Sequence, residues 1–218
     1  MLIAIKSACR SCGRLFEKEV PQSVNVSEEP SLKEAVLDGS LFTWECPHCG
    51  AVNMIRPELL YHDPDAKIMI WLVGDEVRSS RAEELLEAIG EEEALSDYSL
   101  RRVSEPGALI EKVKIADLGL DDVAVELCKY VTAMELSSGE KDGKLSDALS
   151  VAQLRLRSMD GADGRLTFVF PLEGAMHSVS VGFNVYEDCH AILARNPGMR
   201  PAGVFPKVDG EWVRKNFR

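Results

Sequence analysis

The amino-acid sequence predicts an α+β protein with β-hairpins at its N-terminal end, a helical middle and a small C-terminal α/β unit. Three observations support this fold class. Two short cysteine pairs, Cys9 with Cys12 and Cys46 with Cys49, each lie between strand-like segments. Apolar residues recur at helical spacing through the middle of the chain. Near the C-terminal end, residues 178–185 alternate between apolar and other residues with the period of a strand.

Each cysteine pair is a knuckle, in which two residues separate the cysteines and a glycine follows. This spacing lets the chain curl so that both sulfurs face one ion, and the glycine supplies the positive φ that such a turn needs. Structural zinc sites take four ligands at tetrahedral corners, and two knuckles supply four thiolates. We therefore predict one zinc ion, bound by Cys9, Cys12, Cys46 and Cys49.

The 33 residues between Cys12 and Cys46 exceed the roughly 15–20 of the commonest four-cysteine pattern. An inserted helix over residues 30–38 accounts for the excess, because proline stands near its start and Gly39 at its end. Strands are predicted at 2–6, 15–20 and 23–26 before the helix, and at 41–45 and 51–55 around the second knuckle. Two hairpins with knuckles at their turns make a zinc ribbon. A redox dithiol pair and unconnected surface thiols are the alternatives.

Further motifs accompany the knuckles. They are Asn25-Val26, Pro30-Ser31-Leu32-Lys33-Glu34, Gly39-Ser40-Leu41-Phe42, Cys46-Pro47-His48-Cys49-Gly50 and Leu60-Tyr61-His62-Asp63-Pro64. Together they resemble the CpXC proteins, a family named for this cysteine pattern, and the likeness ends near residue 130. Arg10 stands where a proline would repeat the second knuckle, but the ligands and the glycine remain. The resemblance implies a zinc-binding domain and no particular activity.

The middle of the chain is expected to be helical. A strand ending in a turn at 60–65 and a buried strand over 67–73 precede a linker at 74–80. Helices are then predicted over 81–89, 107–116 and from about 121 through Met134, with a short extended piece at 100–103. Asp121 and Asp122 fit an N-cap better than a metal-binding or acid–base pair, because they precede an apolar helix.

The C-terminal part is predicted to combine strands and helices. Strands are expected over 151–159, 166–170 and 178–185, with an edge strand at 204–208. A helix over 186–195 and a helical turn over 210–217 complete the unit. By sequence the chain divides into three parts: a zinc-ribbon part at 1–76, an acidic helical part at 80–138 and an α/β unit at 145–218.

Charge and hydropathy narrow the function classes. The net charge is −11, and residues 80–149 alone hold 17 acidic and 8 basic side chains. No basic stripe is present, which argues against nucleic acid as a partner.

No apolar run approaches the roughly 18 residues that span a bilayer, and no signal peptide is recognisable. Thiols arranged for metal suit a reducing compartment, so we expect a soluble, cytoplasmic protein. The sequence specifies no oligomeric state.

Catalytic alternatives involve the remaining cysteines and histidines. Cys189 and His190 are neighbours in a predicted helix, so they point about 100° apart and form a poor nucleophile and base. His177 is a conceivable distant partner, Cys128 suits a helix core, and His62 suits a structural hydrogen bond. No phosphate-binding loop, nucleophile elbow or His-Glu-x-x-His motif is present.

We therefore favour a zinc-binding protein-interaction or adaptor module over an enzyme. A nucleic-acid-binding ribbon and a cysteine-dependent redox enzyme are the alternatives.

Overall fold

The computed structural model describes residues 2–74, 84, 95–138, 154–161 and 164–217. The chain is mixed α+β, as predicted, and divides into two compact units. The first unit holds Met1–Ile110 with Gly203–Pro206, and the second holds Glu111–Ala202 with Lys207–Arg218. The division falls inside helix α3 (Pro106–Asp117). The three-part division made from the sequence stays a prediction.

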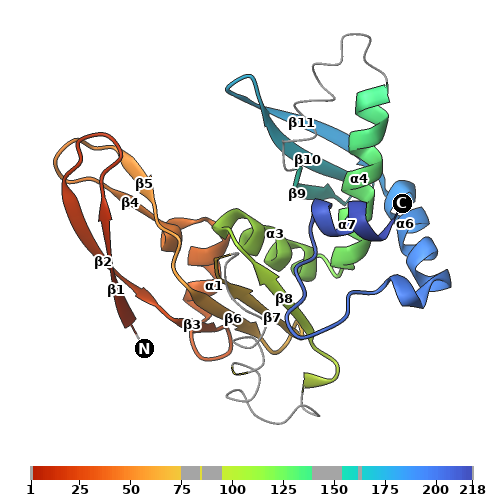
Figure 1. The fold of residues 1–218 in the computed structure, drawn as a ribbon, viewed down its shortest axis with the longest axis horizontal. Coiled ribbons are helices and arrows are strands. Elements are labelled where there is room, and N and C mark those ends of the chain that lie inside the picture. The colour runs from red at the N-terminus through yellow and green to blue at the C-terminus, as the bar shows by residue number, and fades with distance from the viewer. Residues whose placement is uncertain (1, 75–83, 85–94, 139–153, 162–163, 218) are drawn as a thin grey trace. The chain divides into compact units, whose positions relative to one another are not determined.

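Two separate β-hairpins open the first unit and form the ribbon (Figure 1). Strand β1 (Leu2–Ala8) pairs antiparallel with β2 (Leu15–Pro21), and β4 (Thr43–Glu45) pairs antiparallel with β5 (Val52–Met54). Alternate residues of β1 and β2 face inward, as the period of a strand requires. The hairpins share a small apolar core made of Cys9, Val20, Trp44, Cys46 and Ile55.

The rest of the first unit is a four-stranded mixed sheet with the strand order β3-β6-β7-β8. Its strands are β3 (Ser23–Asn25), β6 (Leu59–Asp63), β7 (Ile68–Leu72) and β8 (Ser99–Val103). The β6–β7 pair is antiparallel, whereas β3–β6 and β7–β8 are parallel. Every residue of β7 is buried, which confirms the buried strand predicted over 67–73.

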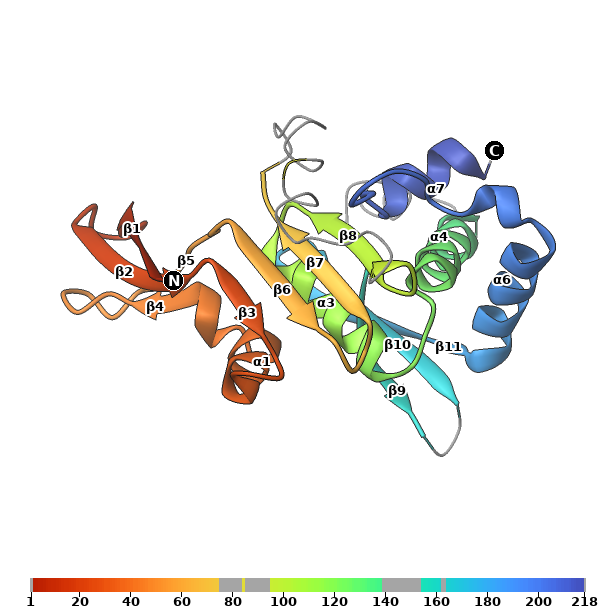
Figure 2. The same cartoon turned by 90° about the horizontal axis from the view of Figure 1, so that it is seen from below.

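Helix α1 (Pro30–Leu37) confirms the predicted insertion between the knuckles. It packs beside β3 (Figure 2), and Lys33 forms an ion pair of 2.9 Å with the carboxylate of Asp63 at the end of β6. Burial acts to raise the pKa of Asp63, but Lys33 and the backbone N–H of Ala66 outweigh it and lower that pKa. After the helix, Gly39 adopts φ +81 and turns the chain into the 3-10 turn η1 (Ser40–Phe42).

The second unit is built on an antiparallel sheet with the order β11-β10-β9. Its strands are β9 (Arg155–Asp160), β10 (Arg165–Leu172) and β11 (Ala175–Gly182). Helix α4 (Asp122–Ser138) packs against α6 (Phe183–Arg195) and α7 (Gly210–Asn216) (Figure 2). A 3-10 turn, η3 (Pro197–Met199), follows α6. The largest core cluster in the described residues belongs to this unit.

Most predicted elements are present, but the predicted boundary between the strand at 178–185 and the helix that follows it was wrong. The strand predicted over 178–185 ends at Gly182, and Phe183 instead opens α6. Phe183 fits both periods, and the helical period prevails because Tyr186, Cys189 and Leu193 bury one face of the helix. The helix predicted over 81–89 lies outside the described residues, apart from residue 84.

The edge strand predicted at 204–208 was wrong, since these residues form no strand. Phe205 adopts φ +47, which no strand accommodates, and its ring lies edge-on to Trp71 with the ring centroids 6.0 Å apart. The backbone N–H of Arg102 donates to the carbonyl of Pro206. The segment at 204–208 is thus held by the buried ring of Phe205 and not by pairing with a strand.

Asp121 confirms the N-cap predicted for α4. Its Oδ1 accepts hydrogen bonds from the backbone N–H groups of Val123 (2.9 Å) and Ala124 (3.3 Å), and its other oxygen pairs with Arg200. Asp122 does not share the cap. Its carboxylate pairs at 2.8 Å with Lys112 of α3.

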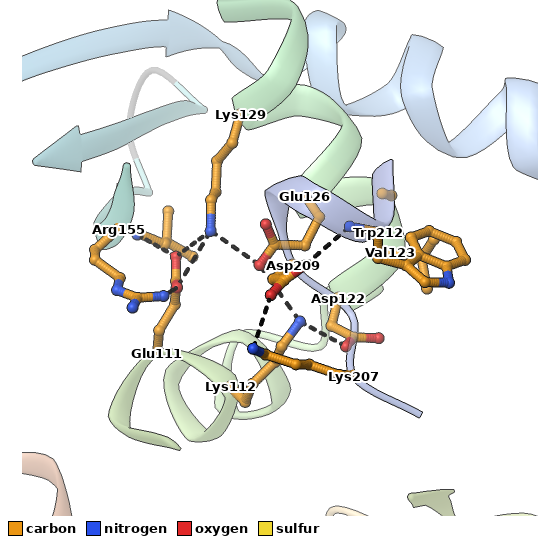
Figure 3. A network of polar contacts seen from close by, with 12 residues as sticks. Glu111, Lys112, Asp122, Val123, Glu126, Lys129, Arg155, Lys207, Asp209 and Trp212 are labelled. Carbon is orange, nitrogen blue, oxygen red and sulfur yellow. Dashed lines mark hydrogen bonds and ion pairs between the residues drawn. The ribbon is translucent and has the colours of Figure 1, made fainter. Parts of the chain in front are cut away.

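Asp122 is part of a buried ionic network that joins α3, α4 and β9 in the second unit (Figure 3). Glu111 lies at its centre, 3.1 Å from Lys129 Nζ and 3.0 Å from Arg155 Nη1. The backbone N–H of Leu156 also donates to Glu111, at 2.6 Å. Three carboxylates (Glu111, Asp122, Glu126) face three cations (Lys112, Lys129, Arg155), so the network is balanced in charge.

No helix among the residues that the structure describes is both long and apolar enough to cross a membrane.

Candidate metal centre

The two knuckles have the same backbone geometry. In each, the amide of the following glycine donates to the carbonyl of the first cysteine: Gly13 to Cys9 at 2.8 Å and Gly50 to Cys46 at 2.9 Å. The backbone N–H of each first cysteine in turn donates to the carbonyl of the residue just after the glycine, which is Arg14 for Cys9 and Ala51 for Cys46. Gly13 and Gly50 have φ of +71 and +69, which confirms the conformational role predicted for both glycines.

The fold brings all four predicted cysteines together. Their four Sγ atoms lie within 4.8 Å of one another, with 3.6 Å between Cys9 and Cys49 and 3.7 Å between Cys12 and Cys46. A zinc ion with four Zn–S bonds of about 2.3 Å requires sulfurs about 3.8 Å apart. A disulfide requires about 2.05 Å, and none of these cysteines is disulfide-bonded. The donor set therefore fits a tetrahedral metal ion.

The four thiols differ in their surroundings. Cys9 and Cys46 are buried, whereas Cys12 and Cys49 are exposed. The backbone N–H of Cys12 holds the pKa of Cys9 down to about 6, with help from Ser11 and Asn53 and against the effect of burial. For Cys12, the backbone of Arg14 acts to lower the pKa, but partial desolvation and the three neighbouring sulfurs outweigh it and raise the pKa to about 11. A metal ion that binds Cys12 must therefore displace the proton of that thiol.

Asn53 of β5 joins the second hairpin to the first knuckle, a role that the sequence analysis missed. Its Oδ1 accepts the backbone N–H of Arg10 at 2.9 Å, and its Nδ2 lies 3.6 Å from Cys9 Sγ. The same Nδ2 donates to the carbonyl of Ala51 at 2.8 Å. A signal existed in the sequence, because Asn53 is a polar residue at an inward position between the outward Val52 and Met54.

Replacing Asn53 with alanine is expected to weaken metal binding about 10- to 100-fold, the usual cost of losing a group that orients a ligand. The variant removes the hydrogen bond to Arg10 and the contact to Cys9. Competition against a chromogenic chelator measures the affinity. Val52→Ala, on the exposed side of the same strand, is the matched control and should leave the affinity unchanged. Equal affinities for the two variants would contradict the role of Asn53.

Two further contacts fix one hairpin on the other. Lys18 of β2 reaches across to the end of η1, where its Nζ donates to the carbonyls of Ser40, Leu41 and Thr43 at 3.1, 3.2 and 2.6 Å. Burial lowers the pKa of Lys18. Phe16 and Trp44 stack between the hairpins. The knuckles are therefore positioned by side chains that come from both hairpins.

The other residues considered in the sequence analysis lie outside this site. His62 Nε2 is 3.2 Å from the Tyr98 hydroxyl, a structural hydrogen bond as predicted. His177 stacks on Phe170. His190 is exposed and stacks on Tyr186, whereas Cys189 is buried, so the two neighbours do point apart. Cys128 and Cys189 both lie in the core of the second unit.

Comparison with known proteins identifies one family. A family model described as CpXC protein matches residues 7–129, which is more than half of the chain and includes both knuckles. No curated protein matches the sequence, and no solved structure matches the fold. On the extent of the family match, the chain belongs to the CpXC protein family.

Proposed function

We propose that this CpXC protein binds one structural zinc ion through Cys9, Cys12, Cys46 and Cys49, and that the resulting ribbon is a docking module for another protein. The observation that carries the zinc proposal is the set of four free thiols at the spacing of a tetrahedron. Four thiolates favour zinc among common divalent ions. They also fill every coordination position, so the ion would stabilise the fold and would have no open position for substrate.

The docking role rests on the apolar surface of the ribbon. The residues that the structure describes include seven large apolar side chains that are exposed, and four of them belong to the ribbon. Val52 and Met54 project from the same face of β5, and Leu15 at the start of β2 is 82 % exposed. The fourth is Leu2. Val52 and Met54 therefore form an exposed apolar pair on one face of β5, and adjacent exposed apolar side chains are typical of surfaces that bind proteins. A metal site built from thiols suits a reducing compartment, so we place the protein in the cytoplasm.

Nucleic acid is the second candidate partner, and one observation favours it. Arg10, Arg14 and His48 lie exposed at the knuckles, and Arg14 Nη1 donates to His48 Nδ1 at 2.8 Å. The net charge of −11 opposes this alternative. Binding to phosphates would weaken about tenfold or more between 50 and 200 mM salt, whereas docking through apolar side chains would change little.

Metal analysis of protein purified without added zinc tests the first half of the proposal. We expect about one zinc ion per chain by native mass spectrometry, because structural sites of this type bind zinc with about 10–16 kcal/mol. Removal of the ion with a strong chelator should unfold the ribbon, seen as loss of the Trp44 and Phe16 environment by fluorescence and NMR. Metal-free protein with a folded ribbon would contradict the structural role.

The docking role is tested with Val52→Ser and Met54→Ser combined in one chain. This variant should retain zinc but lose, by about tenfold or more, the protein that the wild-type chain binds in its native extract. Met134→Ser is the matched control, because Met134 is also exposed but lies on α4. If both variants bind equally well, the apolar face of the ribbon is not the docking surface.

A further inference from the structure

The two outer strands of the sheet in the second unit differ in how they are protected from further pairing. In the described part of the chain, β11 is the outer strand on one side and β9 on the other (Figure 1). β9 carries three charged residues, Arg155, Arg157 and Asp160, and a register shift interrupts its pairing with β10. β11 contains no Asp, Glu, Lys, Arg or Pro, and it pairs with β10 over eight residues without a shift. Edge strands that lack charges, proline and bulges readily pair with another strand.

The register shows which backbone groups of β11 face outward. Pro171 lies opposite Met176, and proline has no N–H, so these two residues do not exchange backbone hydrogen bonds. Because such pairs alternate with hydrogen-bonded pairs, Met176, Ser178 and Ser180 all direct their N–H and C=O groups away from β10. The carbonyl of Ser180 agrees with this, since it accepts a hydrogen bond from the Arg165 side chain at 2.8 Å. β11 therefore offers the backbone of three residues to a further strand.

The side chains of β11 also suit an added strand. Met176 is 67 % exposed, and Ser178 and Ser180 are exposed on the same face of the strand. On the opposite face, Val179 and Val181 pack against the core of the unit but are only partly buried. A strand added at this edge would bury both valines further and would meet no charged side chain of β11.

Charges at the two ends of β11 favour a second copy of this chain as the source of the added strand. Glu173 lies exposed in the turn before β11, and Arg165 lies exposed opposite Gly182 at the other end. The Arg165 guanidinium reaches the outer edge of β11, because it contacts the Ser180 carbonyl. When β11 pairs antiparallel with its own copy, the acidic end of each strand meets the basic end of the other. No like charges face each other along the strands between these ends.

We propose that two copies of the chain form a dimer in which their β11 strands pair antiparallel and join the two three-stranded sheets into one. Ser178 lies at the two-fold axis, opposite the partner's Ser178, and Met176 lies opposite the partner's Ser180. In this register, the three outward-facing residues of one strand form hydrogen bonds with those of the other. The dimer uses neither the cysteine cluster nor the apolar face of β5, since both belong to the ribbon.

Sedimentation equilibrium of the full-length chain tests the dimer. Between about 1 and 200 µM chain, a range in which weak association is measurable, the average mass should rise towards twice the 24.0 kDa of one chain. Hydrogen exchange at the two ends of this range then locates the contact. The outward-facing amides of β11 should exchange about tenfold more slowly at the high concentration, while those of β9 should not change. A chain that stays monomeric, or a dimer without this protection of β11, would overturn the proposal.

Ser178→Lys is the variant that tests the register. The side chain of Ser178 is exposed, and the substitution places two ammonium groups opposite each other at the two-fold axis. The dissociation constant of the dimer should rise about tenfold or more. The substitution also makes the net charge less negative, so greater overall repulsion between the chains cannot explain a weaker dimer.

Ser158→Lys is the matched control, because it makes the same change in charge on β9, at the other edge of the same sheet. This variant should dimerise as the wild-type chain does. A dimer that Ser178→Lys leaves intact would place the interface on another surface and so refute the proposal. Hydrogen exchange of the wild-type chain needs neither variant, so the test stands even if a variant fails to fold.

Discussion

Replacing Cys46 with serine is expected to abolish stable metal binding and to unfold the ribbon while the second unit stays folded. A serine hydroxyl is a poor zinc ligand, and Cys46 is one of the two buried sulfurs of the site. Its loss leaves three ligands, and the small apolar core that the two hairpins share does not hold them together alone. The expected zinc content falls from about one ion per chain to about one-tenth or less.

Two measurements check this result. Elemental analysis gives the zinc content, and two-dimensional NMR shows whether resonances of the ribbon collapse while those of β9 to β11 persist. Cys128→Ser is the matched control, because it changes a cysteine to serine outside the site and should retain the ion. A Cys46→Ser chain that keeps stoichiometric zinc would refute the assignment of Cys46 as a ligand.

Glu111→Gln is expected to destabilise the second unit by about 3–5 kcal/mol, the usual cost of removing one partner from a buried ion pair. Glu111 is 2 % exposed. It forms ion pairs with Lys129 and Arg155 and accepts a hydrogen bond from the backbone N–H of Leu156. The neutral amide would leave Lys129, itself buried, without its centrally placed partner. Chemical denaturation measures the change, with the fluorescence of Trp212 as a reporter in the same unit.

The control for this prediction is Glu17→Gln on the outer face of β2. Glu17 pairs with Lys6 at 3.7 Å, and both side chains are more than half exposed. Exposed ion pairs contribute about 0–1 kcal/mol, so this substitution should have little effect on stability. If the two glutamine variants prove equally stable, the buried network does not stabilise the unit.

The network also predicts how stability depends on pH. Burial acts to raise the pKa of Glu111, but Lys129 and Arg155 outweigh it and lower that pKa below its usual 4.5. The contribution of Glu111 to the free energy of unfolding is therefore complete above pH 4.5 and is lost as the pH falls through the lower, folded value.

For Lys112, burial acts to lower the pKa, but Asp122 and Glu126 raise it above 10.5. That contribution is complete below pH 10.5 and is lost as the pH rises through the higher, folded value. The urea concentration at the unfolding midpoint should be constant between these limits. In Glu111→Gln, the decrease of this midpoint on the acid side should be smaller.

The cluster of four cysteines could be predicted from the sequence because each knuckle is a local structure. Two residues between cysteines and a glycine after them determine the turn, wherever the turn lies in the fold. The N-cap at Asp121 was predictable for the same reason. In contrast, Asn53 contacts Cys9 from 44 residues away, and Lys18 reaches carbonyls more than 20 residues further along the chain. Such contacts depend on how the two hairpins pack, which no short pattern records.

The buried network was hidden for a related reason. Glu111, Lys112 and Lys129 have the composition of an exposed, charged helix surface, and only the packing of α3, α4 and β9 makes them interior. Cys128 was predicted to lie in a helix core, and the cluster that contains it also includes Cys189 from another helix. At Phe205, burial of a single ring overrode a strand-like run of residues.

The division of the metal site into two buried and two exposed sulfurs has a kinetic consequence. Cys12 and Cys49 come from different knuckles, and both face solvent, so the site has one open edge. If the proposed zinc ion is bound, a competing chelator or another metal-carrying protein would replace these two ligands one after the other, while Cys9 and Cys46 would continue to hold the ion. Metal exchange would then proceed through mixed-ligand intermediates, at a rate that increases with the concentration of the acceptor. A tightly held ion can in this way also be a rapidly transferable one.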